Sequence, residues 1–188
     1  MIAYGSQLTQ DSHFFAAAMK KEWVEGQTRT IKLPEECPAT MAHYLAYSYG
    51  GKLFTEDIKS GSLRKDESHI ETCFQMLVSL YVCGEHFLNQ RIQQSVVKEV
   101  LRISLSRGEG GYWYPTQEEV NIMYRGTPKG SPGRRLMVDL QVLMGAKDEL
   151  THELEVAFII DVAKALHEKL SEVNCGIAKA HLIAEDYF

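Results

Sequence analysis

The chain has 188 residues, of which 45% are hydrophobic and 24% are charged. This length suits one compact domain, or one domain with a small extension, and the hydrophobic share excludes a wholly disordered protein. The Lys and Arg residues number 20 and the Asp and Glu residues 25, so the formal net charge is −5. Neither this charge nor the scattered positions of the basic residues supports binding to nucleic acid.

The cysteines and the amino terminus indicate the cellular compartment in which we expect the protein to function. Four cysteines are widely spaced and form no Cys-x-x-Cys pair, which is typical of reduced thiols in an intracellular protein, nuclear or cytoplasmic. The first six residues lack the basic and apolar regions of a signal peptide. No apolar run is long enough to span a membrane, so we expect no membrane partner.

The first predicted elements are a helix and a strand. Asp11 or Ser12 can cap a helix that runs to about Trp23, and Gly26 is expected to end it. Residues 28–33 alternate in polarity and contain Thr, Ile and Leu, which predicts an edge-like strand. A single strand cannot satisfy its own main-chain hydrogen bonds, so this strand needs a pairing partner.

A helix rich in tyrosine follows this strand. Pro38 suits its first turn, and Gly50 and Gly51 are expected to stop it. The helical wheel places Tyr44 and Tyr49 on the core face and points Tyr47 elsewhere. Exposed aromatic side chains are enriched at protein interfaces, so Tyr47 is a candidate partner-binding residue. The alternative is a partly buried surface tyrosine.

The rest of the chain is predicted to be almost entirely helical. A polar loop covers residues 55–68, helices cover 69–87 and 88–105, and residues 107–114 form a glycine-rich break. Thr116 and Glu119 form a capping box for a helix to Tyr124, and Ser131 caps a helix to Met144. A last helix spans about residues 153–170, and the tail from 173 to 188 is ambiguous. The fold class is therefore mainly α with a small residual β element.

Local patterns give little sign of catalysis. Cys83-x-x-His86 lacks the second pair of ligands that zinc requires, and Cys83 lies on an apolar stripe, which favours a buried structural cysteine. The loop 126–133 contains Lys129 but not the order of a phosphate-binding loop, which favours a turn between helices. Seven histidines are dispersed and form no nucleophile motif. We expect a non-enzymatic protein without metal or cofactor; a small enzyme that gathers scattered His, Cys and carboxylate groups is the least favoured alternative.

Several stretches, taken in order, resemble the BTB/POZ domain. They are residues 12–18 with the helix motif S-x-F-F, residues 29–35 with the strand motif R-x-I-x-L-P-E, residues 44–53 with a YL-rich helix end, and residues 80–88 with an LYV-rich helix. Residues 113–136 resemble the C-terminal extension of fungal BTB proteins in particular. The resemblance implies an α/β BTB/POZ-like domain over residues 1–105, with a helical C-terminal extension over residues 106–188 packed on it.

The resemblance also implies a function. BTB/POZ domains are protein-interaction modules without a catalytic centre or cofactor; they typically self-associate, and some members recruit a cullin scaffold of ubiquitin ligases. Cullin-binding members carry a hydrophobic-x-Glu motif between the first helix and the strand, and Trp23-Val24-Glu25 matches it in that place. These three residues are therefore candidate partner-binding residues.

One difference from the family concerns the amino terminus. The family begins with two strands and a helix before the S-x-F-F motif, and residues 1–7 are too few for them. The chain thus resembles an N-terminally truncated member. Because the family dimerises partly through that region, the resemblance leaves open whether this chain forms a homodimer. A self-associating structural or regulatory protein without a ligase link is the alternative function.

Overall fold

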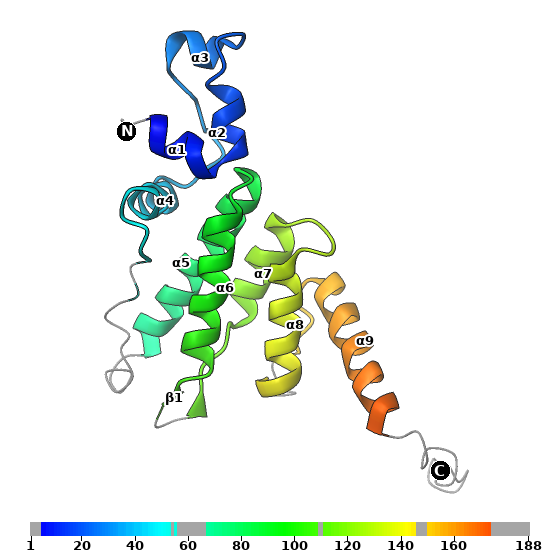
Figure 1. The fold of residues 1–188 in the computed structure, drawn as a ribbon. Coiled ribbons are helices and arrows are strands. Elements are labelled where there is room, and N and C mark those ends of the chain that lie inside the picture. Colours follow the sequence, from blue (N-terminus) through cyan, green and yellow to red (C-terminus); the bar gives the residue numbers. More distant parts are fainter. Residues whose placement is uncertain (1–4, 54, 56–66, 109–110, 146–149, 174–188) are drawn as a thin grey trace, which may run out of the picture.

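The computed structural model describes residues 5–53, 55, 67–108, 111–145 and 150–173 (Figure 1). Within these residues the chain is mainly helical, as predicted. The helices are α1 (Gly5–Asp11), α2 (His13–Ala18), α3 (Val24–Thr28), α4 (Pro38–Gly50), α5 (Glu67–His86), α6 (Gln90–Ser104), α7 (Gln117–Gly126), α8 (Pro132–Met144) and α9 (Val156–Val173). Most of the predicted loop over residues 55–68, and the tail beyond residue 173, lie outside the described residues.

The long helices α5 and α6 form the centre of the molecule. Helix α5 packs against α4, α6 and α7, and α8 packs against α9. Figure 1 shows α1–α4 at one end of the α5–α6 pair and α7–α9 along its side. Leu77 and Val78 of α5 are fully buried, and one continuous hydrophobic core runs from Phe15 in α2 to Val162 in α9. Burial of this apolar surface is the main contribution to the stability of the fold.

An aromatic cluster attaches the N-terminal helices to the end of α5. The ring of Phe87 lies 4.8 Å from the ring of Phe15 and 5.1 Å from that of Tyr44, centroid to centroid. The Tyr44–Phe87 pair has the edge-to-face geometry that aromatic quadrupoles favour. Helices α2 and α4 are thereby fixed to the same end of the central pair.

The helix ends follow the predicted signals. Ser12 caps α2 by accepting a hydrogen bond from the Phe15 amide at 3.2 Å. Gly51 ends α4 with a left-handed φ of 68°, which favours glycine. Glu119 accepts a 2.8 Å bond from the Thr116 amide, as its place in a capping box requires, and Ser131 caps α8.

Two predictions about residues 12–33 are wrong. Helix α2 ends at Ala18 rather than near Trp23, and Gly26 lies inside a further short helix, α3. Residues 30–33 are not a strand, because no other described segment pairs with them. The described residues contain one strand pair, the antiparallel β1 (Arg107–Gly108) and β2 (Gly111–Tyr112), within the predicted glycine-rich break.

Candidate protein-interaction surface

The predicted triplet Trp23-Val24-Glu25 lies at the start of α3, at the end of the molecule remote from α9 (Figure 1). The side chain of Trp23 is 58% exposed and that of Val24 is 67% exposed. Glu25, in the first turn of α3, is half-buried. The structure therefore brings two large apolar side chains together in solvent, and we call Trp23, Val24 and Glu25 the α3 tip.

Main-chain contacts beneath the α3 tip hold it in this form. The Trp23 amide donates to the Lys20 carbonyl at 3.0 Å, and the Thr30 amide donates to the Glu25 carbonyl at 3.2 Å. A Cβ atom on Gly26 would collide with the Lys20 carbonyl, so only glycine allows this close approach. Because backbone groups close the turn, the side chains of Trp23 and Val24 are not needed to hold it.

The assignment of Tyr47 to an exposed face is wrong. Tyr47 is buried, whereas Tyr49, predicted to face the core, is 39% exposed. Tyr44 and Tyr47 are three residues apart and therefore share one helix face, which packs on the central helices. A partner cannot contact Tyr47 without displacing α4, so the structure supports no interaction role for it.

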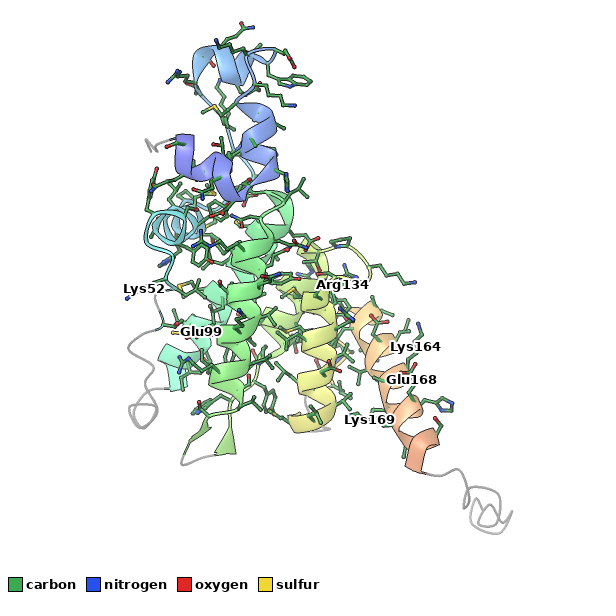
Figure 2. All side chains as sticks on the ribbon, in the orientation of Figure 1. Lys52, Glu99, Arg134, Lys164, Glu168 and Lys169 are labelled. Carbon is green, nitrogen blue, oxygen red and sulfur yellow. The ribbon has the colours of Figure 1, made fainter. Side chains whose placement is uncertain are left out.

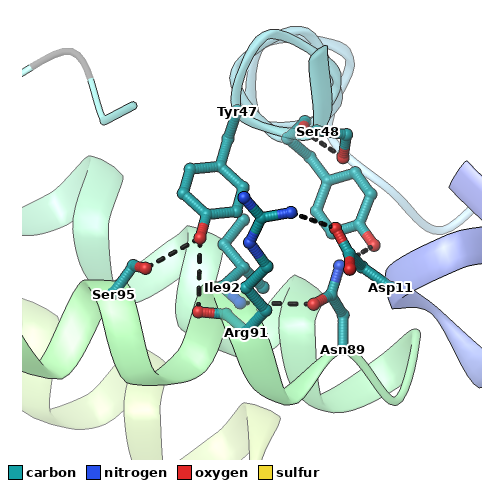
Figure 3. Close-up of polar contacts among 8 residues, drawn as sticks. Asp11, Tyr47, Ser48, Asn89, Arg91, Ile92 and Ser95 are labelled. Carbon is teal, nitrogen blue, oxygen red and sulfur yellow. Dashed lines mark hydrogen bonds and ion pairs between the residues drawn. The ribbon is translucent and has the colours of Figure 1, made fainter. Parts of the chain in front are cut away.

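Tyr47 instead belongs to a polar cluster between α4 and α6 (Figure 3). Its hydroxyl lies 2.7 Å from Ser95 Oγ and donates to the Arg91 carbonyl at 3.3 Å. The side chain of Arg91 pairs with Asp11 at 2.6 Å, which joins the end of α1 to α6. No local sequence pattern predicts this cluster, because its members are as much as 80 positions apart.

In the same region, the side chain of Asn89 forms hydrogen bonds that cap the first turn of α6. Asn89 accepts a hydrogen bond from the Ile92 amide at 3.2 Å and donates to the Tyr44 hydroxyl at 2.9 Å (Figure 3). The cap is buried, and burial raises the pKa of Tyr44. An Asn directly before an amphipathic helix is the sequence signal that predicts such a cap.

Cys83 and His86 lie next to a carboxylate. The Cys83 thiol donates to Glu36 Oε2 at 3.2 Å, and His86 Nδ1 lies 3.0 Å from Glu36 Oε1. Cys83 is buried, as predicted, and burial together with the carboxylate raises the pKa of its thiol. No group of three metal-binding side chains occurs in the described part of the chain. The arrangement serves to connect α5 to the segment before α4.

Cys37 is an exposed cysteine at the N-cap of α4. The main-chain amides of Thr40 and Ala39 in the first turn of α4, together with the Thr40 hydroxyl, favour the thiolate and lower the pKa of the thiol. Its surroundings are thus opposite to those of Cys83, where burial disfavours the thiolate.

An apolar groove of about 470 Å³ lies beside the extended segment that follows α3. Its walls include Leu8, Phe15, Met19 and Met41, together with the segment 29–33 itself. Ile31 and Leu33 are half-buried and pack on the core, whereas Thr30 and Lys32 are exposed. The alternation predicted for this segment is therefore present, although its strand pairing is not.

A charged groove of about 350 Å³ lies between α8 and α9. Its Arg134 donates to the Tyr124 carbonyl at 2.5 Å and stacks over the Tyr124 ring, 4.6 Å from the centroid. The Tyr124 hydroxyl donates to Asp161 at 3.1 Å. Figure 2 shows Arg134 near the start of α8, with Lys164 and Glu168 along α9. Because Arg134 is occupied by internal bonds, it ties α7 to α8 and is not free to hold an anion.

No helix among the described residues is both long and apolar enough to cross a membrane. Comparisons of this chain with protein-family models, with curated proteins and with solved structures gave no match.

Proposed function

We propose that the protein is a non-enzymatic protein-interaction module of the BTB/POZ type that serves as an adaptor for a cullin-type ubiquitin-ligase scaffold. The observation that carries this proposal is the exposure of Trp23 and Val24 at the α3 tip. Among the Phe, Tyr and Trp side chains whose burial is described, Trp23 is the most exposed. A solvent-exposed Trp beside a second apolar residue is the kind of group that becomes a binding hot spot.

The α3 tip suggests how the adaptor would bind. Trp23 inserts into an apolar pocket of the partner, Val24 covers the adjacent surface, and the Glu25 carboxylate accepts hydrogen bonds at the rim. The backbone under the tip is closed by its own hydrogen bonds, so little ordering is needed on binding.

The test is the affinity for the purified N-terminal domain of a cullin, measured by surface plasmon resonance. Truncation of a central Trp anchor costs about 2 kcal/mol or more, so Trp23→Ala should weaken binding about 30-fold. Leu143→Ala is the matched control, since Leu143 is 66% exposed but lies on α8. Equal affinities of Trp23→Ala and the wild type, or no binding by the wild type, would contradict the adaptor function.

A second candidate is a self-associating protein without a ligase link, and α9 favours it. Val156, Ile160 and Leu170 are 68%, 47% and 57% exposed and share one face of the helix. Light scattering tests this function. The wild type should be a dimer, and Ile160→Glu should be a monomer because it places a charge on the exposed apolar face. A wild-type monomer at all concentrations would contradict it.

A further inference from the structure

Residues 30–33 follow Arg29, whose φ of 51° is left-handed, and their burial alternates as it does in a strand, but no described strand lies beside them. The Thr30 amide bonds to the Glu25 carbonyl, and the Leu33 carbonyl accepts from the Glu36 amide. Between these two bonds, the main-chain groups of Ile31 and Lys32 have no hydrogen-bond partner among the described residues. An extended edge with free amides and carbonyls is a template for another strand.

The apolar groove lies directly beside this edge. Leu8, Phe15, Met19 and Met41 line it, and its volume of about 470 Å³ is within the usual range for ligand pockets. In strand addition, main-chain hydrogen bonds give affinity and pockets for alternate side chains give specificity. The free edge and the apolar groove supply these two components next to one another.

Two charged side chains line the groove, and they differ in availability. The Glu36 carboxylate is occupied by Cys83 and His86. The exposed Arg29 has no ion pair or hydrogen bond from its side chain within the described part of the chain. The free charge at the groove is therefore positive, and a complementary ligand carries an acidic residue there.

We propose that this groove binds an extended peptide segment of a partner protein as an added β-strand. The main chain of the peptide pairs with Ile31, which lines the groove, because the main-chain groups of the next residue, Lys32, point to the opposite edge. Alternate apolar side chains of the peptide enter the groove, and an acidic residue at one end of it pairs with Arg29. This surface differs from the α3 tip, so the inference does not depend on the adaptor function.

The probe is the peptide acetyl-Glu-Val-Thr-Val-Thr-amide, titrated into the full ¹⁵N-labelled chain and followed by amide chemical shifts. We expect saturable shifts at Ile31 and Lys32 and slower hydrogen exchange of the Ile31 amide. Dissociation constants above about 1 mM, or shifts confined to other parts of the chain, would overturn the proposal.

Two N-methylated peptides test whether the main chain does the binding. One carries N-methyl groups on both valines and the other on both threonines, so each blocks one edge of the same extended peptide. A strand pairs through one edge only, and therefore one peptide should lose at least tenfold in affinity while the other binds as before. Equal affinities of the two peptides would overturn strand addition.

A charge exchange tests the role of Arg29 and separates the two proposals. Arg29→Glu should weaken binding of the acidic probe and restore it for acetyl-Lys-Val-Thr-Val-Thr-amide, which a folding defect could not do. Trp23→Ala should leave peptide binding unchanged, and Arg29→Glu should leave cullin binding unchanged. If Ile31 and Lys32 amides shift with protein concentration in the absence of peptide, a second copy occupies the groove and the proposal is wrong.

Discussion

The central helices and the α3 tip use apolar side chains in opposite ways. Helices α5 and α6 have 20 and 15 residues, and they bury Leu77, Ile92 and Val96 almost completely. Helix α3 has five residues and buries none, and the α3 tip exposes Trp23, the N-cap, and Val24. So short a helix is unstable alone and here depends on main-chain contacts with its neighbours. Stability therefore resides in the centre, and the exposed side chains of the tip contribute little to it.

The largest effect should follow from a cavity in the centre. Leu77 is fully buried in α5, so Leu77→Ala should lower the free energy of unfolding by about 2–5 kcal/mol. Urea denaturation measures this, with Leu105→Ala as the control, because Leu105 is 63% exposed. If both variants lose the same amount of stability, α5 is not the centre of the core.

A smaller loss should follow from overpacking between α5 and α7. A Cβ atom on Gly126 would collide with the side chain of Val82, so Gly126→Ala should cost about 1–3 kcal/mol. Gly50→Ala is the matched control, since a Cβ atom there meets open space at the end of α4. Thermal unfolding of the two variants compares them; equal melting temperatures would refute the close packing of α7 on α5.

Removal of the Tyr47 hydroxyl oxygen tests whether this side chain faces α6. Tyr47→Phe removes the hydroxyl that bonds Ser95 and the Arg91 carbonyl, and should cost about 0.5–1.5 kcal/mol. In a double-mutant cycle with Ser95→Ala, the two losses of stability should be less than additive, because both substitutions break the same hydrogen bond. Independent effects of the two substitutions would mean that Tyr47 does not face α6.

The smallest predicted effect concerns the reactivity of the Cys37 thiol, and we expect no change in the stability of the protein. The lowered pKa of Cys37 means that its thiolate forms at lower pH than in an ordinary cysteine, so it should react faster than Cys73 and Cys83 with iodoacetamide near neutral pH. Cys73 and Cys83 are buried, and burial raises the pKa of both thiols. Peptide mapping after brief alkylation checks this order; faster modification of Cys83 would show that the centre opens readily.

Local signals in the sequence predicted much of the fold. Ser12, Thr116 and Ser131 start helices where their capping chemistry indicates, because a cap depends only on residues a few positions away. The prediction of a strand over residues 28–33 is wrong, because a strand must pair with a second segment, and alternation within the segment does not show that one is present.

The candidate site was predictable only in part. The sequence motif identifies the Trp23-Val24-Glu25 triplet, and the structure adds the exposure of Trp23 and Val24. The apolar groove could not be predicted from the sequence. Its walls come from α1, α2, α4 and the segment 29–33, which only folding brings together. Tyr47 was misplaced because its burial depends on how α4 lies over α6, which helical periodicity does not specify.

The most direct test of the account measures binding and stability on the same Trp23→Ala sample. If the α3 tip binds and the centre stabilises, affinity for the cullin N-terminal domain should fall about 30-fold while the free energy of unfolding changes by less than about 0.5 kcal/mol. Unchanged affinity, or a loss of stability as large as that of Leu77→Ala, would contradict the separation of the two regions.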